Sequence, residues 1–116
     1  LELVAAAARE QVPLLGVLPD DQAEGMRGLA SATDAIMSGS YDLVVLDEVN
    51  SSISLGIIPL APVLELLDHK PSHVEVICTG RNASPEVCDR AHLVTEMKLV
   101  KHYFYNGEPA REGLDY

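Results

Sequence analysis

Two apolar runs rich in β-branched residues, each ending abruptly in polar residues, constrain the fold of this chain more than any other feature. The first is residues 42–48, Asp-Leu-Val-Val-Leu-Asp-Glu, and the second is residues 74–80, Val-Glu-Val-Ile-Cys-Thr-Gly. Runs of this length and composition are typical of buried strands in a parallel sheet. Residues 23–37 and 60–69 instead place apolar side chains at spacings of three and four, which predicts helices that cover such a sheet.

The remaining segments continue this alternation of strands and helices. We expect an alanine-rich helix over 2–11, an apolar run over 12–18, a short helix over 85–91 with Ser84 as its N-cap, and a fourth strand over 92–97. Alternating strands and helices favour an α/β fold with a parallel sheet. The length of 116 residues suits a single domain, residues 1–116.

The charge of the chain argues against nucleic-acid and membrane partners. Eighteen acidic and eight basic residues give a net charge of −10, whereas binding to phosphate backbones or anionic lipids needs the opposite sign. No apolar run approaches the roughly 20 residues of a membrane-spanning helix, and no secretory signal opens the sequence. We therefore expect a cytoplasmic protein. Cys78, inside the second apolar run, is expected to be a buried and unreactive thiol.

The first run has the pattern of a Walker B strand, four hydrophobic residues followed by Asp47 and Glu48. A buried strand delivers its terminal carboxylates rigidly, so one can hold Mg²⁺ or its waters beside a phosphate while the other orients a nucleophile. Asp47 and Glu48 are therefore candidate metal ligands, either directly or through water. The alternative is a strand that ends in two solvated acids.

The second run ends in Thr79-Gly80-Arg81-Asn82. Glycine permits a close approach of the backbone to a ligand, and the Arg81 guanidinium can make a forked contact with phosphate oxygens. Ligands of parallel sheets collect at the carboxyl ends of the strands, so we expect Asp47 and Arg81 to face one crevice. The alternative is an ordinary surface arginine. The sequence contains no Gly-x-x-x-x-Gly-Lys-Ser/Thr loop, so these residues alone support half of a nucleotide site.

Residues 38–50, 79–81 and 93–102, together with the ending 107–116, resemble the P-loop-type corrinoid adenosyltransferases. These enzymes act on cob(I)alamin or cob(I)yrinic acid a,c-diamide, and the resemblance covers about residues 30–116. It implies a RecA-like fold, a homodimer, and transfer of the 5′-deoxyadenosyl group of ATP to the cobalt(I) of a corrinoid, in cobalamin biosynthesis or salvage. ATP is then a co-substrate, the corrinoid the acceptor and Mg²⁺ the cofactor, with a reductase that supplies cobalt(I) as a candidate partner.

The resemblance also implies roles for residues at the two strand ends. They are Asp47 and Glu48 for magnesium, Thr79, Gly80 and Arg81 beside the nucleotide phosphates, and Asn50 at the rim of the pocket.

The phosphate loop of that family does not occur in this sequence. Residues 2–11 are similar to the helix that follows the loop, and residues 12–18 are similar to the next strand. We therefore expect either an N-terminally incomplete corrinoid adenosyltransferase domain, which alone would transfer adenosyl groups poorly, or a natural short relative. The alternative functions are non-catalytic binding of a corrinoid or nucleotide, and a structural role in subunit association.

Overall fold

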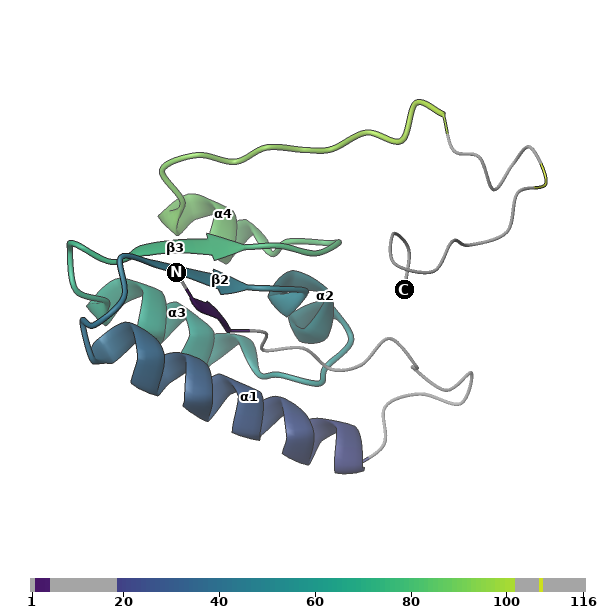
Figure 1. Cartoon of the computed structure of the whole chain (residues 1–116). Helices are drawn as coiled ribbons and strands as arrows, with labels where there is room; N and C mark the ends of the chain where they lie inside the picture. The colour runs from purple at the N-terminus through teal and green to yellow at the C-terminus, as the bar shows by residue number, and fades with distance from the viewer. Residues whose placement is uncertain (1, 5–18, 102–106, 108–116) are drawn as a thin grey trace.

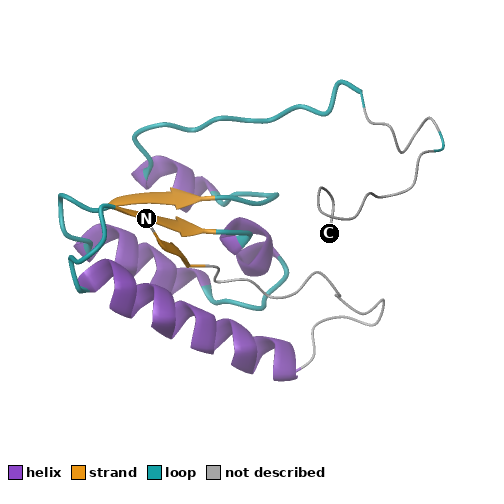
Figure 2. Ribbon diagram, viewed as in Figure 1, coloured by secondary structure: helices purple, strands orange, loops and turns teal. Residues whose placement is uncertain are grey.

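The computed structural model describes residues 2–4, 19–101 and 107, which form a small parallel sheet flanked by helices (Figure 1, Figure 2). The strands lie in the order β1-β2-β3, and both neighbouring pairs are parallel. Parallel strands require crossover connections, and helices lie within the connections here. The elements are β1 (Glu2–Val4), α1 (Pro19–Met37), β2 (Leu43–Leu46), α2 (Val49–Ser54), α3 (Leu60–His69), β3 (Glu75–Cys78) and α4 (Pro85–Arg90).

Helices α1 and α3 lie side by side on one face of the sheet, and the core fills the space between them and β2 (Figure 1). On α1, Leu29, Ala32 and Ile36 recur at spacings of three and four, and all three are buried. Val63 and Leu66 form the corresponding stripe on α3. Each fully buried side chain of this size contributes about 1.5–3 kcal/mol relative to an exposed one. The apolar periodicity therefore decides which face each helix turns inward.

The register between the central strand β2 and its neighbour β3 brings the carboxyl ends of the two strands to the same edge of the sheet. Val44 and Leu46 are completely buried, as alternation along a strand requires. The register pairs Leu46 with Cys78 at the carboxyl end of both strands. Asp47 and Thr79 therefore leave the sheet next to each other, which fixes the position of the candidate site.

Several predicted elements are confirmed. The runs 42–48 and 74–80 contain β2 and β3, and the predicted helix over 60–69 matches α3 at both ends. The predicted helix over 23–37 is also present, but it begins four residues earlier at Pro19. Proline suits that position because its missing N–H would have no partner in the first turn of a helix.

Three expectations are wrong. Residues 2–4 form strand β1 rather than the start of a helix, because they pair with the backbone of β2, and residues 5–18 lie outside the described residues. The segment 92–97 pairs with no described strand, and Leu93 and Met97 are 83% and 93% exposed. Strand β3 is less buried than its sequence predicts, since Ile77 is 46% exposed at the edge of the described sheet.

Among the described residues, no helix combines the length and the apolar character needed to cross a bilayer.

Candidate functional site

The candidate site lies where β2 and β3 end and the short helix α2 begins (Figure 2). Glu48 turns the chain from β2 into α2 with a left-handed backbone conformation, φ 60° and ψ 17°. For a residue other than glycine this conformation costs about 1–3 kcal/mol, so the surroundings must hold it in place. The sequence did not predict α2, since a helix of six residues is too short to show a periodic pattern.

Thr79 joins the ends of the two strands through its hydroxyl. The hydroxyl donates a hydrogen bond to Oδ1 of Asp47 at 2.9 Å and accepts one from the N–H of Glu48 at 2.9 Å. The Thr79 carbonyl accepts a hydrogen bond from the N–H of Asn50 at 3.0 Å, which satisfies an N–H group at the start of α2. The two strand ends therefore meet, as expected, and a threonine hydroxyl makes the contact. That Asp47 and Arg81 face one crevice stays a prediction.

Ser51 is a residue of the site that the sequence argument missed. Its hydroxyl donates a hydrogen bond to Oε2 of Glu48 at 2.7 Å and accepts one from the backbone N–H of Arg81 at 2.9 Å. Residues three apart at a helix start lie on the same face, so the spacing of Glu48 and Ser51 was the available signal. The second contact depends on how β3 meets α2, and no local pattern shows that.

Gly80 allows the loop after β3 to lie against α2. Its φ is +120°, and a Cβ at this position would lie 2.7 Å from Oγ and 2.8 Å from the backbone N of Ser51. Side chains do not reach such distances, so only glycine fits without a shift of the backbone. In this structure the backbone of Gly80 approaches α2, whereas the sequence predicted an approach to a ligand, which stays a prediction.

Arg81 and Asn50 differ in exposure. The Arg81 side chain is exposed, and it forms no ion pair with Asp47 or Glu48 within the part of the chain that the structure describes. Asn50 is 6% exposed, and among the described residues its Oδ1 atom has no hydrogen-bond partner. The side chain is therefore buried at the start of α2, whereas the resemblance implied a place at a pocket rim. The role of both residues in nucleotide binding stays a prediction.

Cys78 lies at the end of β3, directly before Thr79. Burial raises the pKa of its thiol to about 11, because a thiolate is poorly solvated in apolar surroundings. The protonated thiol is a weak nucleophile and a weak metal ligand at neutral pH. The expectation of an unreactive cysteine is supported, although the side chain is only half-buried. The described residues hold no group of three or more His, Cys, Asp or Glu side chains placed for a metal ion.

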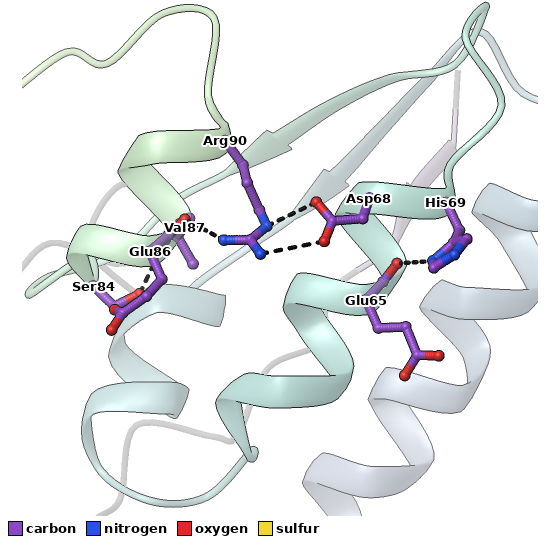
Figure 3. A network of polar contacts seen from close by, with 7 residues as sticks. All are labelled: Glu65, Asp68, His69, Ser84, Glu86, Val87 and Arg90. Carbon is purple, nitrogen blue, oxygen red and sulfur yellow. Dashed lines mark hydrogen bonds and ion pairs between the residues drawn. The ribbon is translucent and has the colours of Figure 1, made fainter.

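A second polar cluster joins α3 to α4 (Figure 3). Arg90 donates hydrogen bonds from Nε to Oδ1 of Asp68 at 2.8 Å and from Nη2 to Oδ2 at 3.2 Å, and from Nη1 to the Glu86 carbonyl at 3.1 Å. The hydrogen bond and charge of Arg90 lower the pKa of Asp68. Ser84 caps α4 as predicted, since its Oγ accepts a hydrogen bond from the N–H of Val87.

The fold is thus that of an α/β protein with a parallel sheet, and its carboxylates, hydroxyls and close-packed glycine lie at the carboxyl ends of adjacent strands. In proteins of this class, that edge of the sheet is where ligands bind. The family model described as ATP:corrinoid adenosyltransferase BtuR/CobO/CobP matches residues 17–116. The chain belongs to this family. The resemblance found in the sequence is thereby confirmed, and the match begins earlier than residue 30.

Individual relatives agree with this membership. A corrinoid adenosyltransferase of Pseudomonas aeruginosa is 42% identical over 85 residues, which cover 73% of this chain and 42% of the relative. Corrinoid adenosyltransferase CobA of Salmonella typhimurium is 40% identical over 75 residues, or 65% of this chain and 38% of the relative. A corrinoid adenosyltransferase of Sinorhizobium is 35% identical over 97 residues, or 83% and 45%. The chain spans less than half the length of these curated relatives.

Proposed function

We propose that this chain serves the transfer of the 5′-deoxyadenosyl group of ATP to the cobalt(I) of a corrinoid. Its family and the names of its relatives support corrinoid adenosylation as the reaction. One structural observation carries the proposal to particular residues. Within the matched region, the hydrogen bond from Thr79 to Asp47 joins an acidic strand end to the Thr-Gly-Arg strand end. A carboxylate for a metal and a guanidinium for a phosphate then belong to one edge of the sheet.

The reaction asks the protein to position groups and to neutralise charge. The cobalt(I) of the substrate supplies the electron pair that forms a bond to the 5′ carbon of the ribose. The bond between that carbon and its phosphate oxygen breaks, and triphosphate leaves with the electron pair of that bond. The exposed guanidinium of Arg81 would make a forked contact with the triphosphate oxygens and offset their charge. The rigid strand ends would hold the reacting atoms in line.

The residues present fit a magnesium ion. Mg²⁺ prefers oxygen ligands and is usually held by one or two carboxylates together with waters and phosphate oxygens. Asp47 and Glu48 each receive a hydrogen bond from a neutral hydroxyl on one carboxylate oxygen, and no cationic side chain among the described residues forms an ion pair with either of them. These two carboxylates would hold the ion or its waters. When bound, Mg²⁺ supplies positive charge beside the leaving triphosphate.

We further propose that the sheet belongs to a RecA-like domain that acts as a homodimer, with residues 1–116 as part of that domain. Because the sequence contains no glycine- and lysine-rich phosphate loop, another part of the protein would cradle the triphosphate. The chain by itself is then expected to bind ATP weakly, with help from Mg²⁺, and to transfer adenosyl groups poorly. Each charge-assisted hydrogen bond that the loop would add contributes about 1.5–3 kcal/mol.

The test is a chimera in which this chain replaces the segment that it matches in the Pseudomonas aeruginosa relative. Formation of the cobalt–carbon bond from ATP and a chemically reduced corrinoid is followed by absorbance. We expect transfer by the chimera and a loss of about tenfold or more on Arg81→Ala, since a charged contact is removed. Arg27→Ala, an exposed arginine on α1, is the matched control.

A folded chimera that transfers equally well with and without Arg81 would contradict the proposed role of this strand end. Tight corrinoid or nucleotide binding without any transfer would instead assign the chain to the non-catalytic binding class. Circular dichroism of each variant separates a loss of function from a loss of folding.

A further inference from the structure

We propose that Ser51 is a positioning residue of this site, which holds the Glu48 carboxylate and the loop after β3 in one fixed arrangement. The proposal rests on the proposed magnesium and nucleotide function. It concerns a residue that no motif in the sequence marks. The observation behind it is a single hydroxyl with two partners, the carboxylate of Glu48 at 2.7 Å and the backbone N–H of Arg81 at 2.9 Å.

The chemistry of the hydroxyl matches both partners. A serine hydroxyl has one hydrogen to donate, and the carboxylate of Glu48 receives it. A lone pair of the same oxygen is then available for the N–H of Arg81. Hydrogen bonds to a charged acceptor are short and strong, which agrees with the 2.7 Å distance. Alanine at this position would leave Glu48 and Arg81 without this connection.

Close packing around Ser51 restricts where its hydroxyl can lie. The backbone of Gly80 lies so close to Ser51 that a Cβ there would sit 2.7 Å from Oγ. Glu48 has a left-handed φ of 60°. Because this conformation is strained, neighbouring contacts must hold the turn if the Glu48 side chain is to keep its direction. Thr79 holds the backbone of this turn through the Glu48 N–H, and Ser51 holds the side chain. Each hydroxyl therefore fixes a different part of the same residue.

This arrangement connects the two charges that the proposed reaction needs. Glu48 would act on the magnesium ion, and Arg81 would act on the phosphates to which the ion binds. Because one oxygen bonds to both residues, a shift of the Ser51 hydroxyl moves the carboxylate and the loop together. The expected consequence of losing the hydroxyl is a weaker effect of Mg²⁺ on nucleotide binding.

The experiment uses this chain with Ser51→Ala and, as a matched control, Ser54→Ala, an exposed serine of the same helix. The first measurement is the nuclear magnetic resonance signal of the Arg81 backbone amide without nucleotide. We expect Ser51→Ala to change its chemical shift and to speed its hydrogen exchange, since the N–H loses its acceptor. Ser54→Ala should leave both unchanged.

The second measurement is the affinity for ATP with and without Mg²⁺, by calorimetric titration. We expect Ser51→Ala to lower the gain that Mg²⁺ brings by about tenfold, and to lower the affinity for metal-free ATP by a smaller factor, because only the Arg81 loop contributes to that affinity. A partly unfolded variant would lose both affinities in the same proportion, so the ratio separates positioning from stability.

An unchanged Arg81 amide, or an unchanged gain from Mg²⁺ in Ser51→Ala, overturns the role of Ser51 and leaves the proposed function standing. Because the chain alone is expected to bind ATP weakly, the titration is also made with the chimera. Failure of both unsubstituted proteins to bind ATP overturns the nucleotide function and, with it, the proposal for Ser51. The unsubstituted proteins therefore show which of the two has failed.

Discussion

The two polar clusters of this molecule bring charged groups together in opposite ways. In the α3–α4 cluster, Asp68 faces the guanidinium of Arg90, and each charge is offset by the other. At the strand ends, Asp47 and Glu48 face the neutral hydroxyls of Thr79 and Ser51. A hydroxyl orients a carboxylate without neutralising it, so the charge stays available to a cation. We infer from the comparison that the partner of a carboxylate distinguishes an acid that stabilises the fold from one that is free to bind a ligand, and the substitutions below test this inference.

The clusters also differ in backbone geometry. The α3–α4 cluster is built on helices with ordinary termini, where Ser84 serves as the N-cap of α4. At the strand ends, Glu48 and Asn82 both have positive φ values, and Gly80 has a φ of +120°. The buried Oδ1 of Asn50 also has no partner among the described residues. Strain and unsatisfied polar atoms are expected where a protein binds a ligand, and they are costly where it only packs.

The largest expected effect at the strand ends is on the reactivity of Cys78. Cys78 ends β3, and Cys88 lies on α4. A rise of the Cys78 pKa from 9.0 to about 11 lowers its thiolate fraction roughly 100-fold at pH 8. A Cys88→Ser variant leaves Cys78 as the single thiol, and its reaction with a disulfide reagent should be slower than that of a cysteine peptide by about this factor. Denatured protein is the control and should react at the rate of the peptide.

The same shift predicts the pH dependence of stability. The folded-state pKa of Cys78 lies above the unfolded value, so the folded protein retains the proton at a pH at which the unfolded chain has lost it. Its contribution is complete below pH 9 and is lost as the pH rises toward about 11. Urea unfolding between these values measures the loss. A Cys78→Ser variant with the same alkaline loss would contradict the assignment.

Asp47→Asn and Asp68→Asn are the pair of substitutions that most directly tests the comparison. Asp47→Asn keeps an oxygen that can accept the hydrogen bond from Thr79 but removes the charge. We expect the gain in ATP affinity from Mg²⁺ to fall by about tenfold, with little change in stability. Asp68→Asn should leave that gain intact and lower stability slightly, because Arg90 loses its charged partner. Calorimetric titration and urea unfolding measure the two effects, and equal loss of ATP affinity in both variants would remove the distinction.

Gly80→Ala tests the close contact between the loop after β3 and α2. The new Cβ would lie 2.8 Å from the backbone N of Ser51, and the alanine would have to adopt a φ of +120°. We expect a loss of about 1–3 kcal/mol in the free energy of unfolding, together with a change in the Arg81 amide signal. Gly56→Ala is the matched control, since Gly56 also has a positive φ of +76°, but a Cβ there would meet no described atom within 4 Å. A similar change in the Arg81 amide in both variants would show that strain alone is responsible.

The sequence predicts the parts of this structure that depend on local pattern. The helix over 60–69 and the β-branched runs that contain β2 and β3 follow from apolar spacing, and burial confirms α3 in particular. The meeting of the Asp47 and Thr79 strand ends follows from their neighbouring places in the sheet. Membership of the family follows from the combination of motifs at residues 38–50, 79–81, 93–102 and 107–116.

What the sequence missed depends on contacts between distant segments. Helix α2 begins directly after the left-handed turn at Glu48, and Thr79, 31 residues further along the chain, accepts a hydrogen bond from the N–H of this turn. The role of Ser51 likewise needs the loop after β3, which lies 30 residues further along the chain. Residues 92–97 have strand-like composition, but a strand also needs a neighbour, and they pair with none of the described strands. Residues 2–4 show the reverse case, since they pair with β2 although the pattern over residues 2–11 predicted a helix.

The smallest expected effect is the contribution of the Asp68–Arg90 ion pair to the free energy of unfolding. This contribution should depend on pH and salt, as expected of an acid whose charge is used within the fold. The guanidinium lowers the pKa of Asp68, so the unfolded chain takes up a proton at a higher pH than the folded protein does. The pair therefore contributes stability above the ordinary pKa of an aspartate, and the contribution is lost as the pH falls through the lowered value. Both side chains are partly open to solvent, so added salt should weaken the pair in the same way. Urea unfolding of Asp68→Asn and the unsubstituted chain should give a small difference at neutral pH that shrinks in acid and in high salt. A difference that persists in acid and in high salt would show that Asp68 acts through packing rather than through its charge.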